Sequence, residues 1–400
     1  MMQKNGPLKG VKVLELGSLI AGPFAGRLFG DFGAEVIKVE PPHIGDPLRK
    51  WRLLKDGTSL WWYVQSRNKK CITLNLKVPQ GQEIIKKLAK EVDIIIENFK
   101  PGTLEKWNIG YEDLKKINPK IIMVRISGYG QDGPYSAKPG FGSIGEALGG
   151  IRYLSGYPDL PPVRTGISIG DSVAAIYAVM SAVMAIYHRD VNGTQGQYID
   201  VALYEAIFSL MESLVPEYDQ FKFIRERSGN TLPGIAPSNI YLCNDGKYVA
   251  IGANGDSIFQ RLTQAMGRED LAQNEAFKSN DGRAKEMAYL DAQITQWTVS
   301  KTIDEVLEIL DKYQIPSGAI YNVADMFKDA HFKAREMIQD VEVEGLGTLK
   351  MPGIMPKFSN TPGSIQWSGL KLGESNREIY GELLGLSSAE LSEMETQGII

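Results

Sequence analysis

The fold is decided by the stretch that begins Val11-Lys-Val-Leu-Glu-Leu16, turns at Gly17-Ser-Leu-Ile-Ala-Gly-Pro23 and continues to Ala34-Glu-Val-Ile-Lys-Val39. Both outer segments are short apolar runs rich in branched residues, a pattern typical of buried strands. A helix is expected over residues 24–29, and Gly30-Asp-Phe-Gly33 ends it. The stretch therefore predicts a strand–helix–strand unit, the building block of a parallel sheet.

The pattern repeats along the next 160 residues. Amphipathic segments that favour helices lie between four further apolar runs, which predict strands at 71–76, 92–96, 121–126 and 197–203. This alternation predicts an α/β fold, with an open parallel, Rossmann-like sheet in a large domain. Ligands bind at the carboxyl edge of such sheets, where the loops 97–102 and 127–134 are expected.

Several classes of function are disfavoured by composition and motif. The spacing Gly17-x4-Gly22 differs from the dinucleotide fingerprint, and no Lys-Ser/Thr pair of a phosphate loop follows it. A net charge of −4 gives no basic surface for nucleic acid. Two distant cysteines, Cys71 and Cys243, and three scattered histidines predict neither a disulfide framework nor a metal site.

The location follows from the apolar segments. Residues 1–6 contain no apolar signal segment. The uncharged run 172–187 falls short of the roughly 20 residues that span a membrane, so it predicts a buried core helix. We therefore expect a cytoplasmic protein that binds no membrane.

The second half of the chain has a different pattern. A hairpin is predicted at 240–251 around Asn244-Asp-Gly246, helices at 256–311, a second hairpin at 341–351 and a final helix at 374–384. The expected organisation is a large α/β domain that begins at 1–215, a small α+β domain at 225–325, and a C-terminal segment 330–400 that returns to the large domain.

Two clusters of similar residues and one aspartate predict where these segments lie in the fold. The aromatic cluster Leu60-Trp-Trp-Tyr63 is expected in the core. The basic segment Arg67-Asn-Lys-Lys70 is expected at a solvated strand edge, or against a polyphosphate. Asp171 ends Val163-Arg-Thr-Gly-Ile-Ser-Ile-Gly-Asp171, just before the uncharged helix, where the helix dipole favours a negative charge. It is either an ordinary helix N-cap or a carboxylate fixed for chemistry.

Several segments, in this order, resemble the class III coenzyme A transferases (the CaiB/BaiF family), which include formyl-CoA:oxalate CoA-transferase. The resemblance covers nearly the whole chain. The segments are Leu8–Leu16 with Ala21-Gly-Pro23, Gly33–Glu40, Asn68-Lys-Lys70, Asn98-Phe-Lys-Pro-Gly102, Ser127-Gly-Tyr-Gly130, Pro139-Gly-Phe141, Arg164-Thr-Gly166, Gly170-Asp171, Asp245-Gly246 and Leu372-Gly-Glu374.

The resemblance implies that Asp171 is the catalytic carboxylate and that CoA is a substrate, with no permanently bound cofactor and no metal. The residues that it implies for the CoA site are Ile20, Ala21, Leu74, Lys77, Asn98, Phe99, Lys100 and Lys106. It also implies an interlocked homodimer. The implied reaction moves CoA from an acyl-CoA donor to a free carboxylic acid through an aspartyl anhydride and an aspartyl-CoA thioester.

The acid itself is not specified by these motifs. Arg125 and Arg164 favour a second carboxylate, hence a dicarboxylate such as succinate or oxalate. Three differences from the oxalate enzyme weaken the case for oxalate as the substrate. They are Pro41 where that enzyme has Arg, Gly142 where it has an acidic residue, and Ala253-Asn-Gly-Asp256 in place of its glycine-rich loop. The alternatives are an α-methylacyl-CoA racemase, although no histidine lies near Phe141, and a non-catalytic CoA-binding protein.

Overall fold

The structure is a computed structural model that describes residues 6–400. Residues 1–5, on which the absence of a signal segment was argued, lie outside the described residues. The chain forms two compact units. Unit 1 comprises Met1–Ile151, Thr165–Phe221 and Lys333–Ile400, and unit 2 comprises Arg152–Arg164 and Lys222–Phe332. The domain limits expected from the sequence stay a prediction.

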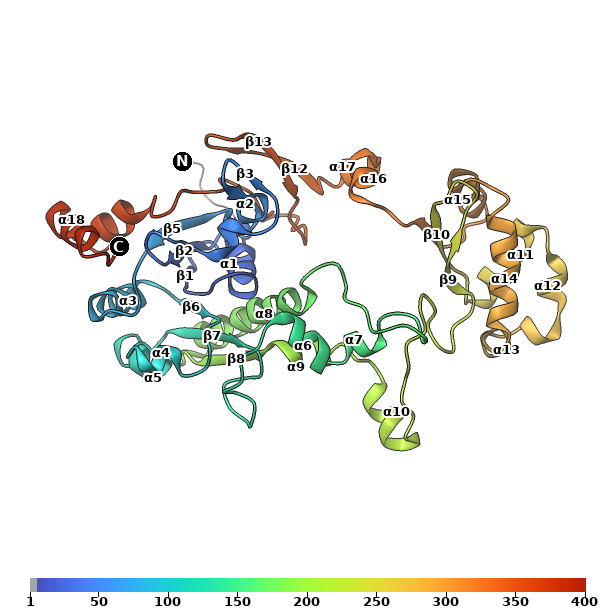
Figure 1. The fold of residues 1–400 in the computed structure, drawn as a ribbon, viewed down its shortest axis with the longest axis horizontal. Helices are drawn as coiled ribbons and strands as arrows, with labels where there is room; N and C mark the ends of the chain where they lie inside the picture. The colour runs from blue at the N-terminus through green and yellow to red at the C-terminus, as the bar shows by residue number, and fades with distance from the viewer. Residues whose placement is uncertain (1–5) are drawn as a thin grey trace. The chain divides into compact units, whose positions relative to one another are not determined.

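Unit 1 is built on a six-stranded sheet, which confirms the predicted parallel α/β fold (Figure 1). Its strands are β1 (Lys12–Glu15), β2 (Glu35–Glu40), β5 (Lys69–Thr73), β6 (Ile94–Glu97), β7 (Ile122–Ser127) and β8 (Tyr198–Ala202), all paired in parallel. Their order is β5-β2-β1-β6-β7-β8. The order reverses between β1 and β6, and ligands of such sheets bind at this reversal, outside the carboxyl ends of the strands.

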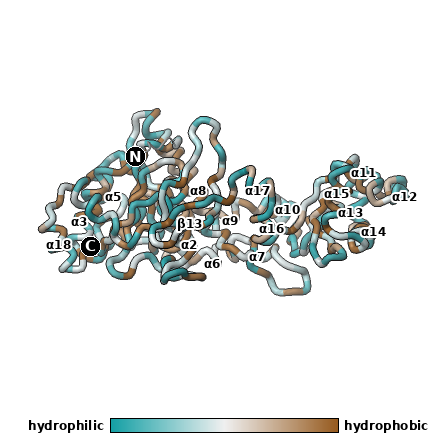
Figure 2. Tube along the Cα trace, turned by 90° about the horizontal axis from the view of Figure 1, so that it is seen from above, coloured by the Kyte–Doolittle hydropathy of each residue, from teal (hydrophilic) through white to brown (hydrophobic). Residues whose placement is uncertain are grey.

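Both faces of the sheet are covered, because neighbouring strand residues point to opposite sides. Val13 packs with α1 (Ala21–Asp31), α8 (Ile169–Asn192) and α9 (Leu203–Phe208), while Leu14 packs with α3 (Pro79–Glu91) and α5 (Tyr111–Ile117). The π-helix Arg377–Leu383 and α18 (Ser388–Thr396) join the second layer. Hydrophilic and hydrophobic residues alternate along the trace, as expected when each element buries one face (Figure 2).

Helix α8 is longer than the sequence indicated. It has 24 residues, ends where Gly193 adopts φ +64°, and is long and apolar enough to cross a membrane by length and composition alone. Its alanine face, which includes Ala174 and Ala182, is buried against the sheet, as in a core helix. The opposite face is not buried in the single chain, since Met184 is 59% exposed and Tyr187 is 66% exposed. The helix is therefore a core helix, as predicted, that is buried on one face only.

The segment 67–70 contradicts the prediction of a solvated edge. Arg67 is buried and donates two hydrogen bonds to the carboxylate of Asp31, at 2.8 and 2.6 Å. Lys69 is equally buried and pairs with Glu15. Buried charges of this kind persist when an opposite charge satisfies them, and sequence alone does not reveal the partner. The aromatic cluster lies in α2 (Leu60–Ser66), where Trp62 and Tyr63 are buried as predicted.

Shorter elements complete unit 1 or lie near the limits of unit 2. The predicted hairpin is confirmed as β12 (Ile338–Val343) and β13 (Gly347–Pro352). The others are the 3-10 helix Pro47–Lys50, β3 (Leu54–Lys55), β4 (Thr58–Ser59), α4 (Thr103–Lys106), α6 (Gly142–Leu148), α7 (Ile151–Leu154), α10 (Leu214–Phe221), α16 (Val323–Lys328) and α17 (Ala330–Ala334).

Unit 2 packs helices on an antiparallel sheet of order β11-β10-β9. The strands β9 (Ser238–Leu242) and β10 (Tyr248–Gly252) form the predicted hairpin, and β11 (Ser317–Ala319) pairs with β10. The helices are α11 (Asp256–Met266), α12 (Glu269–Gln273), the 3-10 helix Glu275–Phe277, α13 (Asn280–Lys285), α14 (Met287–Thr298) and α15 (Ile303–Lys312).

A buried arginine holds the loop before α11. Arg283 is fully buried and donates to the backbone oxygens of Ala236, Phe277 and Asn254 and to the carboxylate of Asp256. The loop 253–256, which stands where the oxalate enzyme has its glycine-rich loop, is therefore fixed from inside unit 2.

Candidate functional site

The loop between β1 and α1 lies at the point where the strand order reverses, and Asn98 holds it there. The Asn98 side chain accepts a hydrogen bond from the Ser18 N–H at 2.8 Å and donates one to the Ser18 carbonyl at 2.9 Å. Gly17 leaves room for this contact, because a Cβ there would lie 2.8 Å from Asn98 Oδ1. Asn98, which the resemblance implied for the CoA site, thus shapes the loop as well as facing the same edge of the sheet.

A buried carboxylate holds the next residue of that loop. Asp46 accepts hydrogen bonds from the Leu19 N–H at 3.1 and 3.2 Å. Leu19 has φ +66°, a left-handed conformation that costs a non-glycine residue free energy and that often marks a functional site. Asp46 also pairs at 2.8 Å with Lys38, whose ammonium donates to the Gly17 carbonyl. The loop is therefore rigid where a ligand is expected.

The ion pair between Asp46 and Lys38, which clamps the loop, stays charged over a wide pH range. Burial opposes ionisation of Asp46, but Lys38 and the backbone donors outweigh it and lower the pKa of the carboxyl. Burial likewise opposes the charge of Lys38, yet Asp46 and Glu15 raise its pKa above the ordinary lysine value. A carboxyl whose pKa is lower in the folded state stabilises the fold at every pH above the ordinary aspartate pKa. This stabilisation is lost only as the pH falls through the folded-state pKa. The clamp is consequently intact at neutral pH.

Besides Asn98 and Phe99, the other six residues implied for the CoA site fall into two groups. Ile20, Ala21 and Leu74 are buried. Lys77, Lys100 and Lys106 are exposed and make no ion pair with residues 6–400, so their ammonium groups are available to phosphates. All six follow β1, β5 or β6 at the carboxyl edge of the sheet.

Two groups at this edge already have partners within the protein. The backbone N–H of Phe99 donates to the Glu97 carboxylate at 2.8 Å. Arg125 pairs with Glu97 and with Glu105, each at 2.8 Å, so its guanidinium already has two carboxylate partners. Burial raises the pKa of Glu97 to about 7, although Arg125 acts in the opposite direction.

Asp171 lies at the same edge of the sheet. Arg189, near the end of α8, pairs at 3.0 Å with Asp93, which precedes β6, so this end of the helix lies at the amino edge. Eighteen residues earlier, about 27 Å along the helix, Asp171 stands at the carboxyl edge. The N-cap is Ser168 and Asp171 is the third helical residue, so the N-cap interpretation was wrong in its position.

The Asp171 carboxylate rests against the first residue of α6. A Cβ built on Gly142 would lie 2.0 Å from Asp171 Oδ2, so the carboxylate fills the space that a side chain at 142 needs. The neighbouring Glu146 is 1% exposed and accepts a hydrogen bond from the Gly170 N–H at 3.4 Å. Sequence reasoning missed the roles of Asp46, Lys38 and Glu146. Asp46 and Glu146 lie outside the segments quoted for the family, and Lys38 lies inside Gly33–Glu40 but was assigned no role. Gly142 was noticed only as a departure from the oxalate enzyme.

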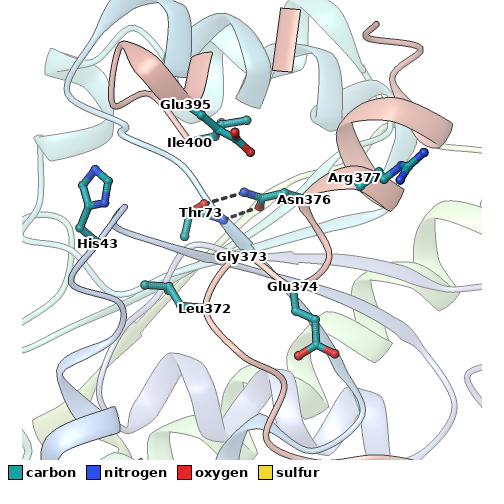
Figure 3. A pocket seen from close by; sticks show the side chains of 9 residues that line it. All are labelled: His43, Thr73, Leu372, Gly373, Glu374, Asn376, Arg377, Glu395 and Ile400. Atoms are coloured by element: carbon teal, nitrogen blue, oxygen red, sulfur yellow. Dashed lines mark hydrogen bonds between the residues drawn. The ribbon is translucent and has the colours of Figure 1, made fainter. Parts of the chain in front are cut away.

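A cavity of about 380 Å³ opens beside the strand that precedes Leu74 (Figure 3). Thr73 and Asn376 line it and are joined by hydrogen bonds of 2.9 and 2.8 Å. His43 and Arg377 line it together with Glu374 and other residues of the C-terminal segment. The mixture of charges favours a neutral polar group over a phosphate.

No group of three metal-ligating side chains is present within residues 6–400. Both cysteines are buried and unpaired, and burial raises the pKa of the Cys71 and Cys243 thiols, which disfavours the reactive thiolate.

Comparison with known proteins identifies the family. The family described as CoA-transferase family III matches residues 8–376. The chain is 50% identical to the succinyl-CoA–D-citramalate CoA-transferase of Chloroflexus aurantiacus over 98% of both chains. It is 41% identical to the beta subunit of the succinyl-CoA–L-malate CoA-transferase of the same organism, again over 98% of both. A solved CaiB/BaiF family protein from Brucella suis is similar in fold, with a TM-score of 0.83, 35% identity, and 95% of this chain and 100% of that chain covered.

A match over this much of the chain, on a fold that brings Asp171 and the implied CoA residues to one edge of the sheet, leads to one conclusion. The chain belongs to CoA-transferase family III and is an enzyme that moves CoA from an acyl-CoA donor to a free carboxylic acid.

Proposed function

We propose that this enzyme transfers CoA from succinyl-CoA to a small dicarboxylate acceptor of the malate or citramalate type. The observation that carries the proposal is the 50% identity, over nearly the full length, to a transferase named for succinyl-CoA and D-citramalate. A second relative, named for succinyl-CoA and L-malate, supports the same class of donor and acceptor. Arg125 is already paired with Glu97 and Glu105, so the proposal of a dicarboxylate acceptor rests on these relatives rather than on an arginine.

Asp171 is the proposed nucleophile. Its carboxylate attacks the thioester carbonyl of the donor, the carbon–sulfur bond breaks, and an aspartyl anhydride and CoA thiolate result. The thiolate attacks the aspartyl carbonyl, which forms an aspartyl-CoA thioester and releases the donor acid. The acceptor carboxylate then attacks the aspartyl-CoA thioester, which expels CoA thiolate and forms a second aspartyl anhydride. The thiolate attacks the acceptor carbonyl of this anhydride, which gives the new acyl-CoA and restores Asp171. Each step exchanges one acyl bond for another, and no proton is gained or lost.

The proposed CoA site uses the rigid loop at the point where the strand order reverses. In this proposal the backbone of Ile20 and Ala21 faces the ligand. It directly follows Ser18 and Leu19, which Asn98 and Asp46 hold, and Phe99 contributes its half-buried ring. Lys77, Lys100 and Lys106 supply the cations for the diphosphate and the 3′-phosphate. The cavity beside Leu74 is suited to the neutral adenosine part.

A panel of donors and acceptors tests the substrate proposal. The purified enzyme is incubated with succinyl-CoA and one free acid at a time, and new acyl-CoA products are identified by mass. We expect transfer to citramalate and malate at rates at least tenfold above those to oxalate and to monocarboxylates. Transfer confined to oxalate would contradict the proposal. Exchange of an α-proton with solvent, without a second acid, would indicate a racemase.

We also propose an interlocked homodimer in the cytoplasm. The exposed apolar face of α8, which includes Ile176, Met184 and Tyr187, is the kind of surface that a second subunit covers. Sedimentation at nanomolar concentration is expected to give the dimer mass, because threaded chains do not separate on dilution. A monomer at that concentration would contradict the interlocked arrangement.

A further inference from the structure

We propose that Gly142 is a positioning residue whose missing side chain provides the space in which the Asp171 carboxylate rests. The inference rests on the proposed role of Asp171 as nucleophile. It adds that residue 142 sets the direction in which this nucleophile points.

In this structure the Cβ of any side chain at 142 would overlap the Asp171 carboxylate. A Cβ on Gly142 would lie 2.0 Å from Oδ2, 2.6 Å from Cγ and 3.1 Å from Oδ1 of Asp171. Real Cβ contacts essentially never fall below 3.0 Å. Even the smallest side chain at this position must therefore displace the carboxylate or the helix that carries it.

Both helices are held in place, so the carboxylate is what moves. Helix α6 cannot retreat, because added Cβ atoms at Gly145 and Gly149 would lie 2.9 Å from Leu203 and 2.7 Å from Ile207 of α9. The first turn of α8 is equally close to α6, since a Cβ at Gly170 would lie 2.8 Å from the Gly142 carbonyl oxygen. Glu146 further ties this turn to α6 through its hydrogen bond with the Gly170 N–H. Rotation of the Asp171 side chain is the remaining response, and it turns the nucleophile away.

The substitution Gly142→Ala tests the consequence for catalysis. A reacting group displaced by about 1 Å can lose roughly 100-fold in rate, and we expect turnover and the rate of covalent labelling at Asp171 to fall by about that factor. CoA affinity, measured by calorimetry with CoA alone, is expected to stay within about threefold, because the CoA residues follow other strands. The matched control is Gly381→Ala, another helical glycine, whose Cβ would meet its nearest atom at 3.8 Å. It is expected to keep normal turnover.

A double-mutant cycle with Tm as the readout tests the contact between residues 142 and 171 independently of activity. Gly142→Ala is expected to lower Tm in the wild type, because the methyl group and the carboxylate compete for one space. In the Asp171→Ala background the carboxylate is gone, so the same substitution is expected to leave Tm unchanged or raise it, since alanine loses less backbone entropy than glycine in a helix.

Two results overturn the positioning role, namely wild-type turnover in Gly142→Ala, or an equal loss of Tm in both backgrounds. An active Asp171→Asn enzyme overturns the proposed function itself. Failure of that function and failure of the positioning role are therefore distinguishable.

Discussion

Replacing Asp171 with asparagine is expected to reduce CoA transfer by several orders of magnitude while the fold and CoA binding persist. The amide has nearly the same shape, but it cannot act as the nucleophile that forms the anhydride. Asp171 is the third residue of α8 rather than its N-cap, so the substitution removes no N-cap hydrogen bond, and a change in stability of less than about 1 kcal/mol is expected. Turnover is measured with succinyl-CoA and citramalate, and Tm and CoA affinity are measured beside it.

The covalent intermediate gives a second readout of the same prediction. Wild-type enzyme incubated with acyl-CoA and quenched in acid should carry the mass of CoA or of the acyl group on the peptide 166–189. Hydroxylamine should convert Asp171 to a hydroxamate in that sample and not in one without acyl-CoA. If Asp171→Asn turns over normally and the peptide carries no label, the covalent mechanism is wrong.

The parallel sheet could be predicted because its signals are local. Runs such as Ile94-Ile-Ile96, apolar on both faces, are typical of central strands in a parallel sheet, and all six strands lie within a few residues of their expected positions. The two hairpins were predictable for the same reason, since Asn244-Asp-Gly246 specifies a tight turn by its own chemistry.

The interactions that build the site are not local, and this is why the sequence did not reveal them. Arg67 and Lys69 have the composition of a surface segment, and only the fold brings Asp31 and Glu15 to them. Arg125 suggested an anion site until the fold placed Glu97 and Glu105 beside it.

The site residue Asp171 was found through the resemblance to a family, not through its local pattern. An aspartate before an apolar helix most often caps it. The space that Gly142 leaves for its carboxylate depends on the crossing of two helices, a property of the fold that no spacing in the sequence encodes.

Replacing Glu15 with glutamine is expected to destabilise unit 1 by about 3–5 kcal/mol, the usual effect of removing one partner from a buried ion pair. Glu15 is fully buried and pairs with Lys38 at 3.0 Å and with Lys69 at 2.7 Å. Without it, Lys38 keeps Asp46, but the Lys69 ammonium keeps only the Pro23 carbonyl at 2.6 Å. The free energy of unfolding is measured by urea denaturation, from the midpoint and from the slope of the free energy against urea concentration.

The same substitution reaches the function through Lys38, which fixes the Gly17 carbonyl and hence the loop implied for CoA, so CoA affinity should fall together with stability. Glu378→Gln is the matched control. It removes a partly exposed carboxylate from Lys70, a contact worth less than about 1 kcal/mol. The double variant Glu15→Gln with Lys69→Met should regain part of the loss, because a neutral pair leaves no buried ammonium without a counter-charge. If Glu15→Gln and Glu378→Gln unfold at the same urea concentration, the buried charges do not support the loop.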